Sequence, residues 1–266
     1  MNIARTGLRW LCLLPALLLP ACAQPINPSF PVTIDQAVQD VDQMEGDPRP
    51  LPRPVVVIAG MMDPGLESAI VKKEIEAVSK GGVVIPVMLA NRFGFDGYRK
   101  NVLDAIDHAL PPDATGQRPA ADVIGFSLGG LVARYAAIPQ NDGRAPLHIA
   151  RLFTISTPHR GALMAEQLPL LMKFQGELRP GSARLAELDA AKPSYPIYCY
   201  VRLRDGVVGP QNAAPPGQLA WWVSTPTGNG PHVGAPMDPR IIADIERRLR
   251  GETPLTTDPP APLPVD

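Results

Sequence analysis

The sequence predicts an α/β domain in which helices flank a mostly parallel central sheet. Between residues 54 and 250, short β-branched or aromatic runs alternate with longer helix-forming segments. A Gly-x-Ser-x-Gly motif, Gly125 to Gly129, joins one such run directly to a helix-forming segment rich in Ala and Leu. Roughly 200 residues suit one domain of this class with a sizeable core.

Local signals justify the individual elements. The valines of 55–59 predict a buried strand, and Gly81 with Gly82 ends a helix expected over 66–79. Asp238 is a suitable N-cap for an amphipathic helix over 239–250. The other expected strands are 83–87, the run that enters the Gly-x-Ser-x-Gly motif, 148–155, 197–203 and 220–223, and the other expected helices are 98–109 and the segment after that motif.

Residues 1–23 have the features of an export signal. Arg5 and Arg9 precede an apolar stretch that is too short to cross a bilayer core about 30 Å thick. Residues 19–22 resemble a lipobox, in which Cys22 becomes the acylated first residue of a lipoprotein. The competing interpretation is cleavage after Ala23. We favour the lipobox, which points to an outer-membrane lipoprotein, whereas the alternative leads to a periplasmic or secreted protein.

Charge and residue content give no reason to expect a nucleic-acid partner, an internal disulfide or a metal. The chain carries 25 Lys and Arg against 26 Asp and Glu, which gives no electrostatic reason to expect nucleic acid. Cys12 and Cys22 belong to the signal, so Cys199 has no internal disulfide partner and is expected as a buried core thiol. No acidic cluster indicates a metal, and we expect no cofactor, no metal and a monomer.

Three segments lie outside the alternating pattern. Residues 24–53 are proline-rich and predict a linker with one short helix around 34–44, acting either as a tether or as an arm packed across the domain. Residues 251–266 predict a disordered proline-rich tail. Residues 162–195 predict a small helical cap insertion, whose apolar side chains could line an acyl pocket as a lid, cover the sheet edge or simply pack in the core.

The Gly-x-Ser-x-Gly motif predicts a catalytic serine. A serine on a tight strand-to-helix turn needs small neighbours two residues away on both sides, and Gly125 and Gly129 meet that need. The following helix directs the amide of Leu128 and the positive end of its dipole toward an oxyanion. The competing interpretation is a glycine-rich turn that happens to contain Ser127, and the flanking strand and helix favour the nucleophile.

Three stretches together resemble the α/β-hydrolase superfamily, and within it the bacterial lipase and esterase group. Residues 125–137 are similar to the Gly-x-Ser-x-Gly-Gly-Leu-Val-Ala-Arg pattern of that group. Residues 154–161 match its Thr-Pro-His-x-Gly block, and residues 55–62 look like its first oxyanion loop. The resemblance covers nearly the whole domain and implies an α/β-hydrolase fold.

The resemblance implies that the triad follows in the order nucleophile, acid, base. Asp205 stands at the end of the strand over 197–203, where the family carries its acid, and the alternative is a turn Asp in an Asp-Gly pair. Asp189 is the next candidate for the acid. His232, between the last strand and the final helix, stands where the family carries its base.

Three further histidines complete the set, and each has a structural interpretation. His108 lies in an expected helix, and His148 enters a strand. His159 belongs to the Thr-Pro-His block, whose role in the family is architectural.

The oxyanion hole requires two backbone donors. Leu128 supplies one, and Met61, just after Gly60, is expected to supply the other. Many relatives have His-Gly at the end of this strand, whereas Ala59 and Gly60 stand here, a departure that leaves the amide available and changes the hydrogen bonding of the loop.

The sequence therefore predicts a serine carboxylic ester hydrolase, an esterase or lipase, that acts on a lipid or other apolar ester. Ser127 is the nucleophile, His232 the general base and Asp205 the orienting acid. Two alternatives remain open: acyl transfer, thioester hydrolysis or amide hydrolysis by the same triad, and a non-catalytic envelope lipoprotein that uses the fold for interaction.

Overall fold

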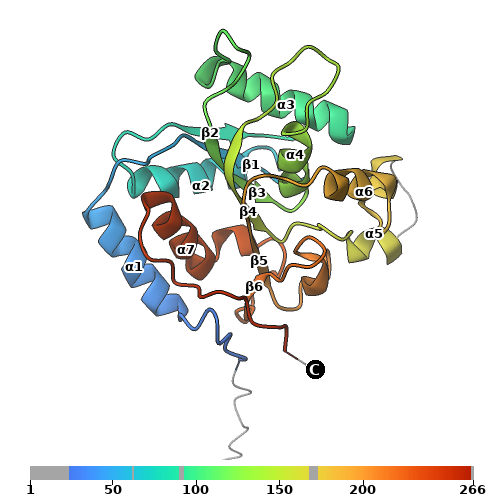
Figure 1. The fold of residues 1–266 in the computed structure, drawn as a ribbon. Helices are drawn as coiled ribbons and strands as arrows, with labels where there is room; N and C mark the ends of the chain where they lie inside the picture. Colours follow the sequence, from blue (N-terminus) through green and yellow to red (C-terminus); the bar gives the residue numbers. More distant parts are fainter. Residues whose placement is uncertain (1–23, 62, 90–92, 168–172, 265–266) are drawn as a thin grey trace, which may run out of the picture.

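The computed structural model describes residues 24–61, 63–89, 93–167 and 173–264. Its centre is a sheet of six strands, all parallel, in the spatial order β2-β1-β3-β4-β5-β6 (Figure 1). The strands are β1 (Val55–Ile58), β2 (Val84–Val87), β3 (Ala121–Phe126), β4 (Ile149–Ile155), β5 (Ile197–Arg202) and β6 (Trp221–Val223). The predicted α/β class with a mostly parallel central sheet is confirmed.

Helices cover both faces of this sheet, because side chains alternate along each strand. Val56 and Ile58 of β1 pack with apolar residues of α3 and α4, whereas Val55 and Val57 pack on the other face with those of α2 and α7. The main helices are α2 (Leu66–Ala77), α3 (Gly94–Ala109), α4 (Leu128–Ala136) and α7 (Pro239–Arg250). Asp238 caps α7 by accepting a hydrogen bond from the backbone N–H of Arg240, as predicted.

The predicted linker over 24–53 is an arm packed on the domain. It contains α1 (Ile34–Gly46), which Thr33 caps through a capping box. Arg247 of α7 donates from Nε to the Asp40 carboxylate at 2.6 Å, and the Arg250 guanidinium donates to backbone carbonyls of the arm. Figure 1 shows α1 lying beside α7. Residues 24–53 therefore form an arm packed across the domain and not a free tether.

The prediction of a disordered tail is wrong for residues 251–264. The tail returns across the molecule, where Thr257 donates its backbone N–H to the carbonyl of Ser29. Both indole N–H groups of β6 donate to tail carbonyls, that of Trp221 to Thr257 at 3.0 Å and that of Trp222 to Pro262 at 2.9 Å. These bonds satisfy buried donors, which is why a proline-rich segment with few apolar anchors is held in place.

The insertion over 162–195 packs against α4. It contains α5 (Leu163–Gln167), η1 (Lys173–Leu178) and α6 (Ala183–Ala190). Leu185 and Leu188 of α6 are buried in the core cluster that also holds Leu131 of α4. Of the three roles considered for this insertion, core packing accounts for these two leucines, and residues 168–172 lie outside the described part.

Two predictions concern residues that the structure does not describe. The export signal over 1–23, with the lipobox cysteine Cys22, lies wholly outside the described residues.

No helix within the described residues has the length and apolarity needed to cross a membrane.

Candidate active site

The three predicted triad residues lie at the carboxyl edge of the parallel sheet. Ser127 directly follows β3, Asp205 stands three residues after β5, and His232 lies in the loop between β6 and α7. Because parallel strands all end at the same edge, residues far apart in the sequence meet there.

The turn at Ser127 is held in an uncommon backbone conformation. Its φ of 46° and ψ of −121° put a non-glycine residue at positive φ between β3 and α4. The glycines two residues before and after Ser127 cannot be replaced by larger residues. A Cβ at Gly125 would lie 2.6 Å from Cα of Gly130, and one at Gly129 would lie 2.5 Å from the carbonyl oxygen of Ala59. The strained turn therefore depends on close backbone approach, a combination typical of functional sites.

Two hydrogen bonds connect the three side chains. His232 Nε2 lies 3.0 Å from Ser127 Oγ, and His232 Nδ1 lies 2.9 Å from Asp205 Oδ2. Because the carboxylate can only accept, Nδ1 carries the proton and Nε2 is free to accept the serine proton. The serine and the imidazole are thus arranged for proton transfer between Oγ and Nε2.

Asp205 is buried, and the backbone that follows it holds its carboxylate in place. Its Oδ1 accepts the N–H groups of Val207 and Val208 at 3.0 and 3.1 Å, and Oδ2 faces His232. Burial by itself raises the pKa of this carboxyl, but the hydrogen bond and charge of His232, together with the N–H of Val208, outweigh it and lower the pKa overall. Asp205 is therefore held as an anion facing the imidazole.

A buried arginine pins the loop that carries His232. Arg202, the last residue of β5, donates from Nη1 to the carbonyl of Gly230 at 3.2 Å and from Nε to Asp238 Oδ2 at 2.8 Å. Arg240 donates to both oxygens of the same Asp238 carboxylate. The histidine loop is thereby fixed on both sides. Sequence reasoning assigned Asp238 only a capping role and missed Arg202, whose one signal is a charged residue at the end of an otherwise apolar strand.

The two predicted oxyanion donors lie on different segments: Leu128 directly follows Ser127, and Met61 follows Gly60, on which a Cβ would lie 3.6 Å from Cβ of Ser127. Leu128 is buried at the first position of α4, where backbone N–H groups have no intrahelical acceptor. Met61 follows the end of β1 and is partly exposed. Met62, the last residue of the predicted oxyanion loop, is outside the described part.

The remaining histidines and the alternative acid do not join this site. His159 is buried with Nδ1 facing Arg134 Nη1 and Nε2 facing Thr154 Oγ1, each at 3.1 Å. Burial, and secondarily the charges of Arg134 and Arg160, lower its pKa well below the ordinary range, so it is neutral. Asp189 pairs with the same Arg134.

His148 and Cys199 are likewise structural. His148 lies 2.9 Å through Nδ1 from the carbonyl oxygen of Arg118. Cys199 is buried, as predicted, and burial raises its thiol pKa to about 12.

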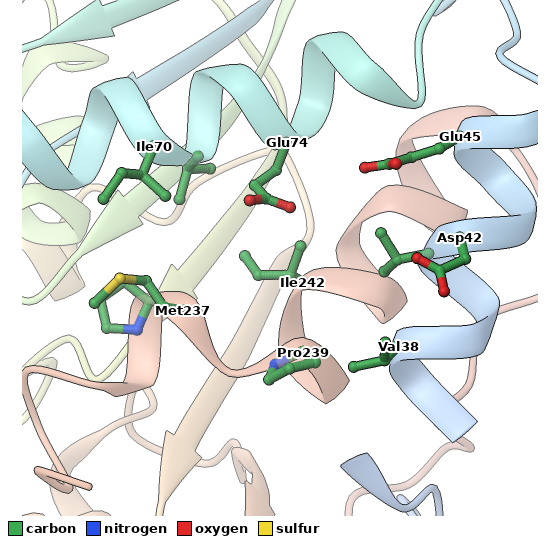
Figure 2. A pocket seen from close by; sticks show the side chains of 11 residues that line it. Val38, Asp42, Glu45, Ile70, Glu74, Met237, Pro239 and Ile242 are labelled. Atoms are coloured by element: carbon green, nitrogen blue, oxygen red, sulfur yellow. The ribbon is translucent and has the colours of Figure 1, made fainter. Parts of the chain in front are cut away.

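A groove of about 370 Å³ lies away from the triad, between α1, α2 and α7 (Figure 2). Its walls are mostly apolar, and Figure 2 shows the carboxylates of Asp42, Glu45 and Glu74 around it. None of the triad residues lines it. Across the described ranges, no group of three or more His, Cys, Asp or Glu side chains is placed to hold a metal.

Part of the chain is similar to a family of putative esterases. Residues 71–178 match the family model described as "Putative serine esterase (DUF676)". That region contains Ser127 but neither Asp205 nor His232. No curated protein sequence matches the chain.

Solved structures share the fold at low sequence identity. Phospholipase PlaB from Legionella pneumophila is 14% identical with a TM-score of 0.50, and the match covers 74% of this chain and 58% of that one. The chain therefore spans little more than half of that phospholipase. The product of the gene lin2722 from Listeria innocua is 12% identical with a TM-score of 0.52, covering 77% of this chain and 96% of that one. The resemblance to the α/β-hydrolases is confirmed for the fold.

Proposed function

We propose that this chain, which has the α/β-hydrolase fold, hydrolyses carboxylic esters through Ser127, His232 and Asp205. The match of residues 71–178 to a family of putative serine esterases supports this class of reaction. The observation that carries the proposal is the pair of hydrogen bonds from Ser127 Oγ to His232 Nε2 and from His232 Nδ1 to Asp205 Oδ2, at 3.0 and 2.9 Å. Combined with the strained turn at Ser127, this arrangement suits nucleophilic attack on an acyl carbon.

In the first half of the reaction, Ser127 Oγ bonds to the ester carbonyl carbon while His232 Nε2 takes the hydroxyl proton. The imidazolium is stabilised by the Asp205 carboxylate, which keeps its own charge. The negative charge on the former carbonyl oxygen is accepted by the backbone N–H groups of Leu128 and Met61, each worth about 3 kcal/mol by analogy with other oxyanion holes. The carbon–oxygen bond to the alcohol then breaks, and Nε2 returns the proton to that oxygen.

The second half repeats these steps with water. His232 Nε2 takes a proton from water as its oxygen bonds to the acyl carbon, and the bond to Ser127 Oγ breaks with return of the proton to the serine. The products are a carboxylic acid and the free enzyme. With an alcohol in place of water, the same steps would transfer the acyl group.

Exposed apolar side chains around the catalytic edge support a lipid or other apolar ester as substrate. Met61 and Leu66 follow β1, Met88 and Phe93 follow β2, and Val233 adjoins His232; Leu66, Phe93 and Val233 are each about two-thirds exposed. Isolated exposed apolar residues need no explanation, but several on neighbouring loops of one edge favour an apolar ligand. We refer to these five side chains as the apolar rim.

The test combines an ester series with a covalent probe. The protein and its Ser127→Ala variant are assayed on p-nitrophenyl esters from acetate to palmitate, and both are exposed to a fluorophosphonate. We expect turnover and labelling by the parent, and a loss on the order of 10⁴-fold or more in the variant. A folded parent that neither turns over any ester nor reacts with the probe would refute the proposal, whereas ester formed from an added alcohol in preference to acid would assign it to acyl transfer.

We further propose that the protein is exported and held at the outer membrane through an acylated Cys22. The proposal rests on residues 1–23 of the sequence alone. Radiolabelled palmitate should enter the parent and not Cys22→Ser, and a mature protein that begins at Gln24 would contradict it.

A further inference from the structure

A carboxylate lies beside the nucleophile without belonging to the triad. Glu67 is in the first turn of α2, and its Oε2 lies 3.4 Å from the position that a Cβ on Gly60 would occupy. The Cβ of Ser127 lies 3.6 Å from that same position. The Glu67 carboxylate and the serine side chain therefore both border the space next to Cα of Gly60.

The start of α2 holds Glu67 in this place. Gly65 adopts φ 102° just before the helix, and both oxygens of the Asp63 carboxylate accept backbone N–H groups, Oδ1 from Leu66 at 2.9 Å and Oδ2 from Glu67 at 3.1 Å. The Asp63 carboxylate thus satisfies two backbone donors in the first turn of α2, whose N-cap residue is Gly65. The Glu67 side chain does not cap the helix, and its carboxylate accepts a hydrogen bond from the backbone N–H of Gly60.

The surroundings make a charge on Glu67 effective at the site. The side chain is half-buried, so water screens its field only in part. Asp63 adds negative charge from the preceding loop, and His232 faces it from the loop after β6. Burial raises the pKa of Glu67, and the charge of Asp63 raises it further, while the N–H of Gly60 and the charge of His232 act in the opposite direction.

We propose that Glu67 is a specificity-determining residue, which excludes esters that carry a negative charge near the scissile bond and favours neutral or cationic ones. The inference rests on the proposed esterase function and names the charge class of its substrate. An anionic group next to the reacting carbonyl would meet the Glu67 carboxylate and the Asp63 carboxylate behind it. A neutral ester meets no repulsion, and a cationic ester is attracted.

The experiment measures charge selectivity with three butyrate esters that share one acyl group. Their leaving groups are phenol, 4-carboxyphenol and 4-(trimethylammonio)phenol, which are neutral, anionic and cationic. The full-length parent is compared with Glu67→Gln, which keeps the shape and an acceptor for the Gly60 N–H but loses the charge. Glu74→Gln, two turns further along α2 in the groove of Figure 2, is the matched control.

The readout is the ratio of kcat/KM for the neutral ester to that for the anionic ester, compared between proteins so that the intrinsic reactivity of each ester cancels. Glu67→Gln should lower this ratio on the order of tenfold, as expected for one nearby unit charge at the effective dielectric of a protein surface. Glu67→Lys should invert the preference, and Glu74→Gln should leave it unchanged. In the parent, the ratio should rise with pH as Glu67 ionises, and in Glu67→Gln it should not.

Two different failures can be told apart. If Glu67→Gln slows all three esters equally and leaves the ratio as in the parent, Glu67 acts only on the structure of the loop and the inference is wrong. If the folded parent hydrolyses none of the three esters, the proposed esterase function itself fails.

Discussion

Arg202 Nε donates to Asp238 Oδ2 at 2.8 Å, and both side chains are buried at the base of the histidine loop. The same guanidinium reaches the carbonyl of Gly230, two residues before His232. The position of the imidazole therefore depends on a charged group that does not touch the reacting atoms. Arg202 is a positioning residue, and its removal should affect turnover through His232.

Arg202→Met should lower kcat by roughly 10- to 100-fold, in the range seen when a supporting group of a catalytic residue is lost. Asp238 stays paired with Arg240, so the buried carboxylate is not left without a partner and the fold should persist. Ester turnover and thermal unfolding are measured on the same preparation. Arg118→Met, which removes a buried arginine bonded to the carbonyl of Leu110 at 2.8 Å, is the control and should alter stability alone. Equal kcat values for parent and Arg202→Met would show that the loop is held by other contacts.

Asp205→Asn tests the orientation of the imidazole. The amide keeps the size of the carboxylate, but its NH₂ group can face Nδ1, which would reverse the tautomer and leave no acceptor for the serine proton. We expect kcat to fall by about 10²- to 10⁴-fold with the melting temperature little changed. Asp189→Asn, at the alternative acid paired with Arg134, should retain ester turnover. The reverse ranking of these two variants would move the acid from Asp205 to Asp189.

Strand positions could be predicted from the sequence because each depends on a local run of apolar residues. The valines of β1 and the run ending at Phe126 specify buried strands without reference to distant partners. The packing of the two ends could not be predicted in this way. Asp40 and Arg247 are over 200 residues apart in the chain, and the indoles of β6 bond to backbone carbonyls of the tail, so no local pattern contains either contact.

The candidate site shows the same division. Ser127 has a motif around it, and the places of Asp205 and His232 follow from the order of the family resemblance. Glu67 and Arg202 have neither a motif nor a place in the family order. The turn at Gly65 places Glu67 near the serine, and Arg202 acts on the histidine loop by a hydrogen bond to the carbonyl of Gly230. Backbone positions of this kind become visible only when the loops are placed in space.

Gly129→Ala should damage both stability and activity. The new methyl group would lie 2.5 Å from the carbonyl oxygen of Ala59 and would also collide with that of Ile58, so the end of β1 and the Gly60–Met61 loop must move away from α4. Overpacking of this kind costs about 1–3 kcal/mol of unfolding free energy, and displacement of the Met61 amide should lower kcat as well. Denaturant unfolding and ester turnover measure the two effects. In Gly46→Ala, where the added methyl group meets open space, neither should fall. A Gly129→Ala protein as stable and active as the parent would mean that the end of β1 can move without loss of stability or activity.

Glu246→Gln should stabilise the protein at neutral pH and not in acid. Glu246 of α7 is fully buried, and neither of its carboxylate oxygens has a hydrogen-bond partner. Burial raises the pKa of this carboxyl well above its ordinary value of 4.5, and the charges of Glu74, Glu45 and Asp40 raise it further against the opposing charge of Arg250. Glu45 and Glu74 carry their carboxylates at the groove between α1 and α2 (Figure 2). Their charge adds to the cost of ionising the buried acid.

The sign of the effect follows from proton binding. With a raised folded-state pKa, the folded protein holds a proton that the unfolded chain has released, so stability falls as pH rises from about 4.5 toward the folded-state pKa. Gln cannot ionise, and the variant should lose this dependence. Melting temperatures of the two proteins should therefore coincide near pH 4 and separate by pH 7 and above, with the variant higher. Glu166→Gln on the exposed surface of α5 should follow the parent at every pH. A constant offset between parent and Glu246→Gln across this range would show that Glu246 has the same pKa in the folded and the unfolded protein, which would contradict the prediction.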